Sequence, residues 1–427
     1  MKLRIEKPIY GGAGLARSEG KAIFVPFTLP GEEVDARIVE DKGGYATAEL
    51  DAVTEPGSDR VPPTCPYFGA CGGCHYQHAA YPAQVQMKIA ILRETLERAK
   101  IREIPEIDAL TGEPFAYRNR VRLHVQSNPF SLCYKRRNSH ANLPIDKCPI
   151  AAPSLQRAIG TLNQQGTKLD LATSASEVEL FTNSDESSLL LAFFTQRPAT
   201  EAQPWLRKSW PQLQQILPAI TGAAIYSSEK GRQPSKFIAQ IGEPSLLYAV
   251  TDAHFHVSLG SFFQVNRFLL DPLVRRVTAG ETGRAAWDLY AGVGLFSAPL
   301  AAQFAEITAV ESAAGSVRDL RQNLHGNPHH VVAAETASFL TRALAQRVPA
   351  PDLVVVDPPR AGLGRDVTTI LGKLRSPRIT YVSCDPATLS RDLAALLESG
   401  YRLRKMQLVD LFPQTFHLES VTHLALD

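Results

Sequence analysis

Asp288-Leu-Tyr-Ala-Gly-Val-Gly-Leu-Phe-Ser297 ends a short apolar stretch that begins at Ala285 and leads into a helical pattern. Gly292 and Gly294 permit a tight turn from strand to helix and let a ligand approach the backbone. Five more apolar stretches follow, with helical patterns between them: residues 307–310, 331–333, 353–356, 380–384 and 403–411. Short buried strands alternating with helices predict an α/β fold with a mostly parallel sheet covered on both faces.

Polar residues at the strand ends predict a site there, because such sheets bind ligands at the carboxyl ends of their strands. Ser297 stands where a dinucleotide fingerprint has its third glycine, which argues against NAD. Glu311 ends the second strand, where a carboxylate can accept hydrogen bonds from both ribose hydroxyls; a solvated helix cap is the alternative. The glycine turn with this acid resembles the adenosylmethionine pocket of class I methyltransferases, whose catalytic domain is Rossmann-like.

The fourth strand ends in Asp357-Pro-Pro-Arg360, which places a carboxylate at the sheet edge. Methylases that act on exocyclic amino groups have an aromatic residue after the prolines to stack the base. Arg360 at this position weakens that interpretation and leaves Asp357 to orient cofactor or base.

The fifth strand ends in Cys384, and Asp385 and Pro386 suit the N-cap and first position of the next helix. The helix N-terminus favours the thiolate by about 0.3 to 1 kcal/mol, whereas Asp385 opposes it. A cysteine at a strand end is more often inert packing. Methylation of uracil carbon 5, however, needs a thiolate that adds to carbon 6 and a base that removes the carbon-5 proton. Glu419, in a Pro-broken loop after the sixth strand, is the candidate base.

Five motifs carry a family resemblance: Phe262-Phe-Gln-Val-Asn266, Asp288-Leu-Tyr-Ala-Gly-Val-Gly294, Asp357-Pro-Pro-Arg-Ala-Gly362, Ser383-Cys-Asp-Pro386 and Asp410-Leu-Phe-Pro-Gln-Thr-Phe-His-Leu-Glu419. Their order resembles that of the RNA uracil-5-methyltransferases, over essentially the whole chain. The resemblance implies Cys384 as nucleophile, Glu419 as general base and S-adenosylmethionine as methyl donor. The residues expected to bind cofactor or base are Gln264, Tyr290, Gly292, Gly294, Glu311, Glu335 and Asp357.

Cys65, Cys71, Cys74 and Cys148 provide four thiolates, three of them within ten residues. Zinc, an iron–sulfur cluster and disulfides are the possible uses. Three close ligands with one distant ligand favour a cubane cluster over zinc, which prefers two close pairs. The family resemblance also implies a [4Fe-4S] cluster, because its ribosomal-RNA members share this spacing. Cys133 is expected in the core.

Residues 115–150 hold seven Lys or Arg against the single acid Asp146, interleaved with aromatic residues. Such a segment suits phosphate neutralisation and base stacking, and a solvated basic face is the alternative. The candidate RNA contacts are Arg118, Arg120, Arg122, Lys135, Arg136 and Arg137.

The chain is expected to have three parts. Residues 1–57 alternate apolar and polar positions between glycine turns, which predicts a small barrel that resembles the OB-like TRAM module. Residues 58–265 form an α+β central domain with the cysteines and basic segment, and its amphipathic helix, residues 81–100, can pack on the catalytic domain. Residues 266–427 form the methyltransferase domain.

The expected substrate is RNA, with a 23S ribosomal-RNA uracil favoured over the tRNA T-loop uracil at position 54. The alternatives are a non-catalytic iron–sulfur RNA-binding protein, which retention of both Cys384 and Glu419 disfavours, and a DNA cytosine methylase, whose nucleophile would lie in the fourth-strand loop. Apolar runs are too short for a membrane span, and no signal-peptide core is present. We expect a cytoplasmic monomer with no obligate protein partner.

Overall fold

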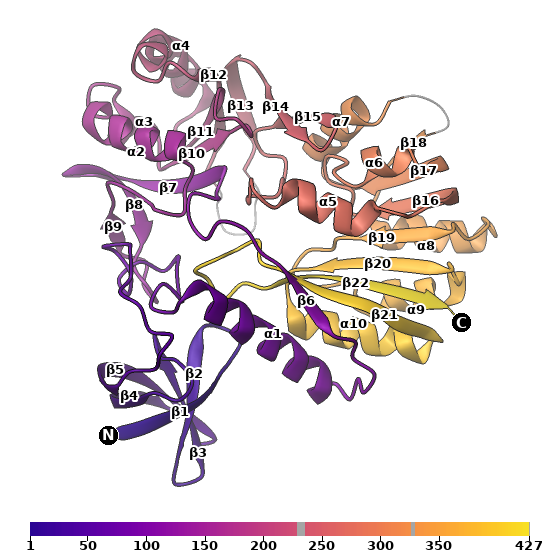
Figure 1. Cartoon of the computed structure of the whole chain (residues 1–427). Coiled ribbons are helices and arrows are strands. Elements are labelled where there is room, and N and C mark those ends of the chain that lie inside the picture. Colours follow the sequence, from indigo (N-terminus) through magenta and orange to yellow (C-terminus); the bar gives the residue numbers. More distant parts are fainter. Residues whose placement is uncertain (229–234, 326–328, 427) are drawn as a thin grey trace.

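The computed structural model describes residues 1–228, 235–325 and 329–426. An eight-stranded sheet of order β18-β17-β16-β19-β20-β22-β21-β6 lies at the right of Figure 1. Its strands are β16 (Gly283–Leu289), β17 (Phe304–Glu311), β18 (His329–Ala333), β19 (Leu353–Val356), β20 (Arg378–Ser383), β21 (Tyr401–Val409), β22 (Glu419–Leu426) and β6 (Ile107–Leu110). The five strands from β18 to β20 are parallel, so the predicted α/β sheet is confirmed.

Helices cover both faces of this sheet because its strands alternate apolar side chains between two cores. Ala286 and Val355 belong to one core, whereas Trp287 and Val354 belong to the other. The helices are α5 (Leu270–Thr278), α6 (Ser297–Ala301), α7 (Ala314–Asn323), α8 (Thr336–Ala345), α9 (Gly364–Leu374), α10 (Pro386–Glu398) and α1 (Tyr81–Arg98). Of all helices in the described residues, none is long and apolar enough to cross a membrane.

Two strands of this sheet were not expected from the sequence. Strand β22 lies antiparallel between β20 and β21, so Glu419 is the first residue of a strand and the prediction that it lies in a loop was wrong. Strand β6 pairs with β21 although about 290 residues separate them, and α1 packs against α10. A four-residue strand has too little pattern to be assigned without its distant partner.

A seven-stranded sheet of order β13-β12-β11-β10-β7-β8-β9 lies at the upper left of Figure 1. Its elements are β7 (Arg120–Ser127), β8 (Phe130–Lys135), β9 (Asn142–Pro144), α2 (Pro153–Gln165), α3 (Leu171–Ser174), β10 (Glu177–Thr182), β11 (Leu189–Thr195), α4 (Ala199–Ile216), β12 (Ile220–Ser227) and β13 (Phe237–Gly242). The hairpin β14 (Ser245–Val250) and β15 (Ala253–Ser258) packs on the eight-stranded sheet through Tyr248 and Val257. Cys133 is fully buried, as expected.

The N-terminal residues form the predicted closed barrel, with strand order β1-β2-β3-β5-β4. Its strands are β1 (Lys2–Pro8), β2 (Ala13–Ser18), β3 (Lys21–Pro26), β4 (Glu33–Asp41) and β5 (Tyr45–Glu55). Alternate residues of β1, Leu3 and Ile5, point into a small apolar core that includes Val25 and Val34. The α/β catalytic domain with an OB-like barrel and an α+β part is therefore confirmed as the fold class.

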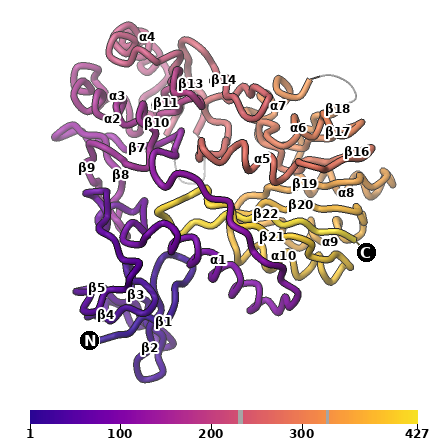
Figure 2. The backbone as a smooth tube through the Cα atoms, viewed as in Figure 1, coloured from indigo at the N-terminus to yellow at the C-terminus, as the bar shows by residue number. Residues whose placement is uncertain are grey.

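The loop of residues 410–418 leaves the eight-stranded sheet between β21 and β22 and enters the middle of the molecule, as Figure 2 shows. Distant segments hold it there. Lys88 on α1 donates to the Asp410 carboxylate at 2.5 Å and to the Phe412 carbonyl at 2.9 Å, with both charged side chains fully buried. Gln84, one turn earlier, exchanges hydrogen bonds with Gln414.

Replacing Lys88 with Met should destabilise the protein by about 3 to 5 kcal/mol, because the Asp410 carboxylate would remain buried without its cation. Chemical denaturation of wild type, Lys88→Met and Lys88→Met/Asp410→Leu measures the effect. The double variant removes both charges and should recover most of the loss. Equal unfolding midpoints for wild type and Lys88→Met would contradict a stabilising pair.

Candidate active site and cysteine cluster

The carboxyl ends of β16, β19 and β20 meet at one edge of the eight-stranded sheet, together with the start of β22. In the β20–β22 register Ser383 pairs with Ser420, so Cys384 and Glu419 are the next residues on neighbouring strands. Asp288, near the end of β16, and Asp357, the residue after β19, lie at the same edge. The structure thus brings the proposed nucleophile, the proposed base and two further carboxyls together.

The Cys384 thiol lies just before α10, whose N-cap is Asp385 and whose first residue is Pro386, as predicted. The Asp385 carboxylate accepts hydrogen bonds from the backbone N–H groups of Ala387 and Thr388 at 3.0 and 2.9 Å, so it occupies donors of the helix terminus. Burial, then the charges of Glu419 and Asp357, raises the pKa of Cys384 to about 12, while Arg360 opposes this rise. Burial therefore outweighs the helix-terminus effect expected from the sequence.

Three buried carboxyls share this edge. Burial, then the charge of Asp357, holds the pKa of Glu419 well above its ordinary value of 4.5. Burial raises the pKa of Asp288 and of Asp357 to about 7, and neighbouring negative charge adds to both shifts. Within the described part of the chain, Glu419 Oε1 and Asp288 Oδ1 are buried without hydrogen-bond partners. Unpartnered buried oxygens mark a place that a polar ligand can satisfy.

The turn after β16 suits a bound nucleoside. Gly292 and Gly294 have φ angles of +56° and +94°, and a Cβ on Gly294 would lie 2.8 Å from Leu320 Cδ1. Glu311, at the end of β17, accepts hydrogen bonds from the N–H groups of Gly292, Ser312 and Ala313. A carboxylate has about four acceptor sites, so these bonds leave capacity for a ribose hydroxyl. Glu311 thus holds the glycine turn and the residues just before α7, whose N-cap is Ala313 and has no side-chain cap.

The other predicted cofactor residues lie around this turn and the carboxyls. Gln264 is 5% exposed, and its side chain lies near enough to Asp357 to oppose the rise in the Asp357 pKa. Tyr290 is half-buried with φ of +65°, and its hydroxyl lies near the Thr336 side chain. Glu335 is the N-cap residue of α8, and its negative charge contributes to raising the pKa of Tyr290.

Cys65, Cys71, Cys74 and Cys148 line a single cavity of about 420 Å³. In the described residues, no three His, Cys, Asp or Glu side chains lie close enough to hold a single metal ion. The four cysteines share this space with cations, since Arg118, Lys135 and Lys147 also line it. Burial nevertheless raises the pKa of Cys65, Cys71 and Cys74, to about 12 for Cys74. Four cysteine side chains on one cavity are the number and type of donor that an iron–sulfur cluster takes.

The six predicted RNA contacts divide into two groups. Arg120 is engaged inside the protein: it donates to the Ser261 carbonyl at 2.7 Å and lies 3.9 Å from the centre of the Phe181 ring. Arg118 lies over the Tyr117 and Phe412 rings, 5.9 Å from each centre, and lines the cysteine cavity. The outer positions are Arg122 beside Glu177, Lys135 bonded to Asn142, Arg136 on the surface and Arg137 over Phe27.

A parallel sheet with a glycine turn after its first strand, an acid ending its second and a thiol beside buried carboxyls defines a class I methyltransferase. The family described as tRNA (Uracil-5-)-methyltransferase matches residues 80–426, and the TRAM domain matches residues 1–50. The chain belongs to the RNA uracil-5-methyltransferase family and is an S-adenosylmethionine-dependent enzyme.

Individual relatives match the chain over nearly its whole length. An uncharacterized RNA methyltransferase of Aquifex aeolicus is 32% identical, covering 99% of this chain and 98% of the relative. The 23S rRNA (uracil(1939)-C(5))-methyltransferase RlmD of Halomonas elongata is also 32% identical, covering 98% and 88%. The crystal structure of Pyrococcus abyssi tRNA (uracil-54, C5)-methyltransferase with S-adenosyl-L-homocysteine has a TM-score of 0.78, 23% identity and complete coverage of both chains, so its fold is shared.

Sequence reasoning assigned no role to Asp288 or Lys88. Asp288 is a single acid in the apolar stretch of β16, and its carboxyl accepts a hydrogen bond from Ser297 Oγ at 2.5 Å. A lone charge in a buried strand was the available signal. Little in the sequence indicated that Lys88 is buried, because lysines are common on the exposed faces of amphipathic helices.

The Asp288 carboxyl should contribute a loss of stability as pH rises from about 4 to 7, whereas the buried histidines His75, His78 and His417 act in the opposite direction. Its pKa is 3.8 in the unfolded chain and about 7 in the folded protein. Between these values the folded state keeps a proton that the unfolded state has lost, so raising the pH favours unfolding. Thermal unfolding of wild type and Asp288→Asn at pH 5 and pH 8 isolates the Asp288 contribution: relative to wild type, the variant should be more stable at pH 8 than at pH 5. An unchanged difference would contradict the raised pKa.

Proposed function

We propose that this enzyme methylates carbon 5 of a uridine in 23S ribosomal RNA through a covalent bond between Cys384 and carbon 6 of the uracil. The observation that carries the proposal is the β20–β22 register, which puts Glu419 next to Cys384 on the neighbouring strand. Relatives named as 23S ribosomal-RNA enzymes favour that RNA. A tRNA uracil at position 54 is the alternative, by analogy with the substrate named for the Pyrococcus abyssi enzyme.

Cys384 would act as the nucleophile. Its sulfur forms a bond to carbon 6, and the electrons of the carbon 5–carbon 6 double bond move toward oxygen 4, which makes carbon 5 nucleophilic. The thiol must lose its proton in this step. Burial raises the pKa of the thiol to about 12, so it needs an acceptor, and the nearby Asp357 carboxylate would take this proton and return it to the Cys384 thiolate released at the end. Glu419 would thus stay free for the carbon-5 proton. S-adenosylmethionine would supply the methyl group that carbon 5 takes up.

Glu419 would act as the base that ends the reaction. Its carboxylate removes the proton from carbon 5, the double bond re-forms, and the bond between carbon 6 and the Cys384 sulfur breaks. Its surroundings favour this role, because a carboxylate whose pKa is raised by burial is a stronger base than an exposed one.

The cofactor would bind across the Gly292–Gly294 turn, with Glu311 at its ribose and Gln264, Tyr290, Glu335 and Asp357 around it. S-adenosylmethionine carries a positive sulfonium charge. The buried carboxyls of Asp288 and Asp357 would stabilise that charge and would ionise more readily beside it.

We also propose that Cys65, Cys71, Cys74 and Cys148 hold a [4Fe-4S] cluster with a structural role. The residues after Cys74 contact the loop of residues 410–418, which leads to Glu419 and is called the catalytic loop below. The N–H groups of His75 and Tyr76 both donate to the Gln414 carbonyl in this loop, at 2.8 and 3.0 Å. On the other side, Gly72 N–H donates to the Lys135 carbonyl at 3.2 Å. The cluster would thereby fix the basic segment, with Arg122, Lys135, Arg136 and Arg137 toward RNA, and the loop before Glu419.

Tritium release from [5-³H]uracil-labelled 23S rRNA and tRNA transcripts tests the mechanism and identifies the RNA. Cys384→Ala should reduce release to background, because no adduct can form. Glu419→Gln should instead accumulate a denaturation-resistant adduct of RNA and protein, because the carbon-5 proton stays in place. Cys133→Ala, a buried cysteine outside the site, is the matched control and should release tritium as wild type does. Unchanged release from Cys384→Ala would defeat the proposal.

Iron and sulfide analysis of wild type should find about four of each per chain. Cys71→Ser should lose the cluster and bind RNA more weakly, whereas the matched control Cys133→Ser should retain both the cluster and affinity. A cluster-free Cys71→Ser protein that kept its fold and its RNA affinity would contradict the structural role.

A further inference from the structure

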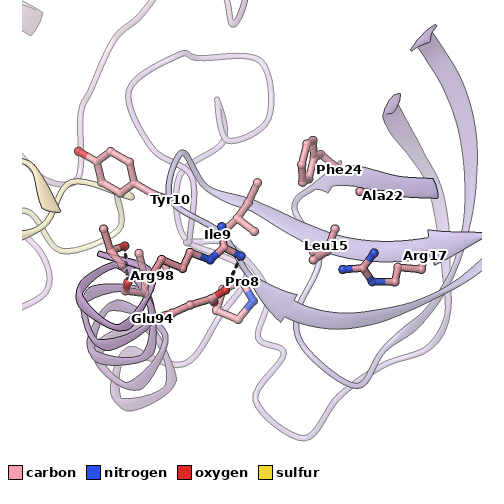
Figure 3. Close-up of a pocket in the computed structure, with 11 residues that line it drawn as sticks. Pro8, Ile9, Tyr10, Leu15, Arg17, Ala22, Phe24, Glu94 and Arg98 are labelled. Carbon is pink, nitrogen blue, oxygen red and sulfur yellow. Dashed lines mark hydrogen bonds and ion pairs between the residues drawn. The ribbon is translucent and has the colours of Figure 1, made fainter. Parts of the chain in front are cut away.

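The turn between β1 and β2 carries an aromatic residue from the barrel to the catalytic loop. Burial, then the nearby charge of Asp385, the residue after Cys384, raises the pKa of Tyr10, and the Tyr10 ring meets the Phe416 ring edge-on with centres 5.5 Å apart. Figure 3 shows Tyr10 extending away from Leu15 and Phe24 of the barrel, toward the yellow C-terminal segment. A cavity of about 400 Å³ separates those barrel residues from α1. The barrel therefore touches the active site through Tyr10.

Two contacts set this position. Gly12, with φ of +92°, packs so closely that a Cβ there would lie 3.0 Å from His75 Cβ, beside the cysteine cluster. Lys7 at the end of β1 bonds the Glu94 carboxylate of α1 at 2.5 Å. The turn between β1 and β2 is thus held by close packing at Gly12 and by the Lys7–Glu94 ion pair just before it.

Four rings continue from this turn across the catalytic loop. The Phe416 ring centre lies 5.5 Å from Tyr10, 4.4 Å from His417 and 4.6 Å from His75, and all four side chains are half-buried. Burial, with nearby cations, lowers the pKa of His417 to about 4, so the His417 ring is neutral at pH 7. Neutral aromatic rings with partly open faces are the surfaces on which unpaired RNA bases stack.

A cation accompanies these rings. Arg360 is exposed, and its charge affects the pKa of Tyr10, Cys384 and His417, so it lies among all three. Aromatic rings beside an exposed guanidinium match a nucleotide, because the base can stack while the phosphate pairs with the cation. These rings and Arg360 lie beside the Cys384 thiol, outside the position that the target uracil would occupy.

We propose that Tyr10, Phe416 and His417 form a stacking surface for an unpaired RNA base that neighbours the target uridine. This inference rests on the proposed function, because a uracil that reaches Cys384 must leave its own stack and so deprives its neighbour of a stacking partner. The barrel then contributes directly to substrate binding at the active site. Its small excess of acids does not oppose this, since stacking needs ring faces and not net charge.

Binding of the transcript that releases tritium, to proteins that all carry Cys384→Ala, tests the proposal without any covalent chemistry. Tyr10→Leu should weaken binding about tenfold, whereas Tyr10→Phe, which keeps the ring, should bind within about twofold of the parent. Tyr45→Leu is the matched control, because Tyr45 is an exposed tyrosine on β5 of the same barrel. Its affinity should not change.

Transcripts with one abasic ribose at each position flanking the target locate the contact. The parent should lose about tenfold at one position, and Tyr10→Leu should lose nothing further there. The proposal is overturned if Tyr10→Leu binds like the parent, if Tyr10→Phe is as weak as Tyr10→Leu, or if Tyr10→Leu weakens every abasic transcript by the same factor. A failed Cys384 mechanism would appear in tritium release and would leave these affinities unchanged.

Discussion

The buried ion pair between Lys88 and Asp410 is the interaction on which the active site depends. Lys88 lies on α1, and Asp410 is the first residue of the catalytic loop, so the pair joins these two segments. Neither side chain has any exposed surface. Burial lowers the pKa of Lys88 despite the Asp410 partner, so the pair is formed at the cost of removing two charges from water. Such a pair tolerates little displacement. The loop that ends at Glu419 therefore keeps its path only while the N-terminal half of the chain is docked on the sheet.

Burial also governs the ionisation of the acids at the carboxyl edge of the sheet. Asp288, Asp357 and Glu419 lie where water is scarce, and each raises the cost of ionising its neighbours. The resting site thus holds protons that a cationic ligand would displace. With raised pKa values, Asp288, Asp357 and Glu419 carry less negative charge than exposed acids would, which limits their repulsion of a Cys384 thiolate.

Much of the fold and site could be predicted because the signals were local. The strand-to-helix turn at Gly292 and Gly294, the N-cap at Asp385 and the barrel strands each depend on a few adjacent residues, and all were found where expected. The strand that begins at Glu419 was missed because its partners, β20 and β21, flank it only in the folded sheet. The raised pKa of the thiol could not be predicted, because a helix-terminus effect can be estimated from sequence, whereas burial cannot.

The class of fold, the family motifs and the candidate nucleophile, base and cluster ligands could be assigned from the residues alone. Most of these signals are residue types at short spacing, where backbone geometry and side-chain chemistry act over one or two turns. The position of Glu419 beside Cys384, the contact of Lys88 with the catalytic loop and the reach of Tyr10 toward the active site required the folded chain. These relations join residues that are up to about 400 positions apart, and packing between separate parts of the chain, not local propensity, brings them together.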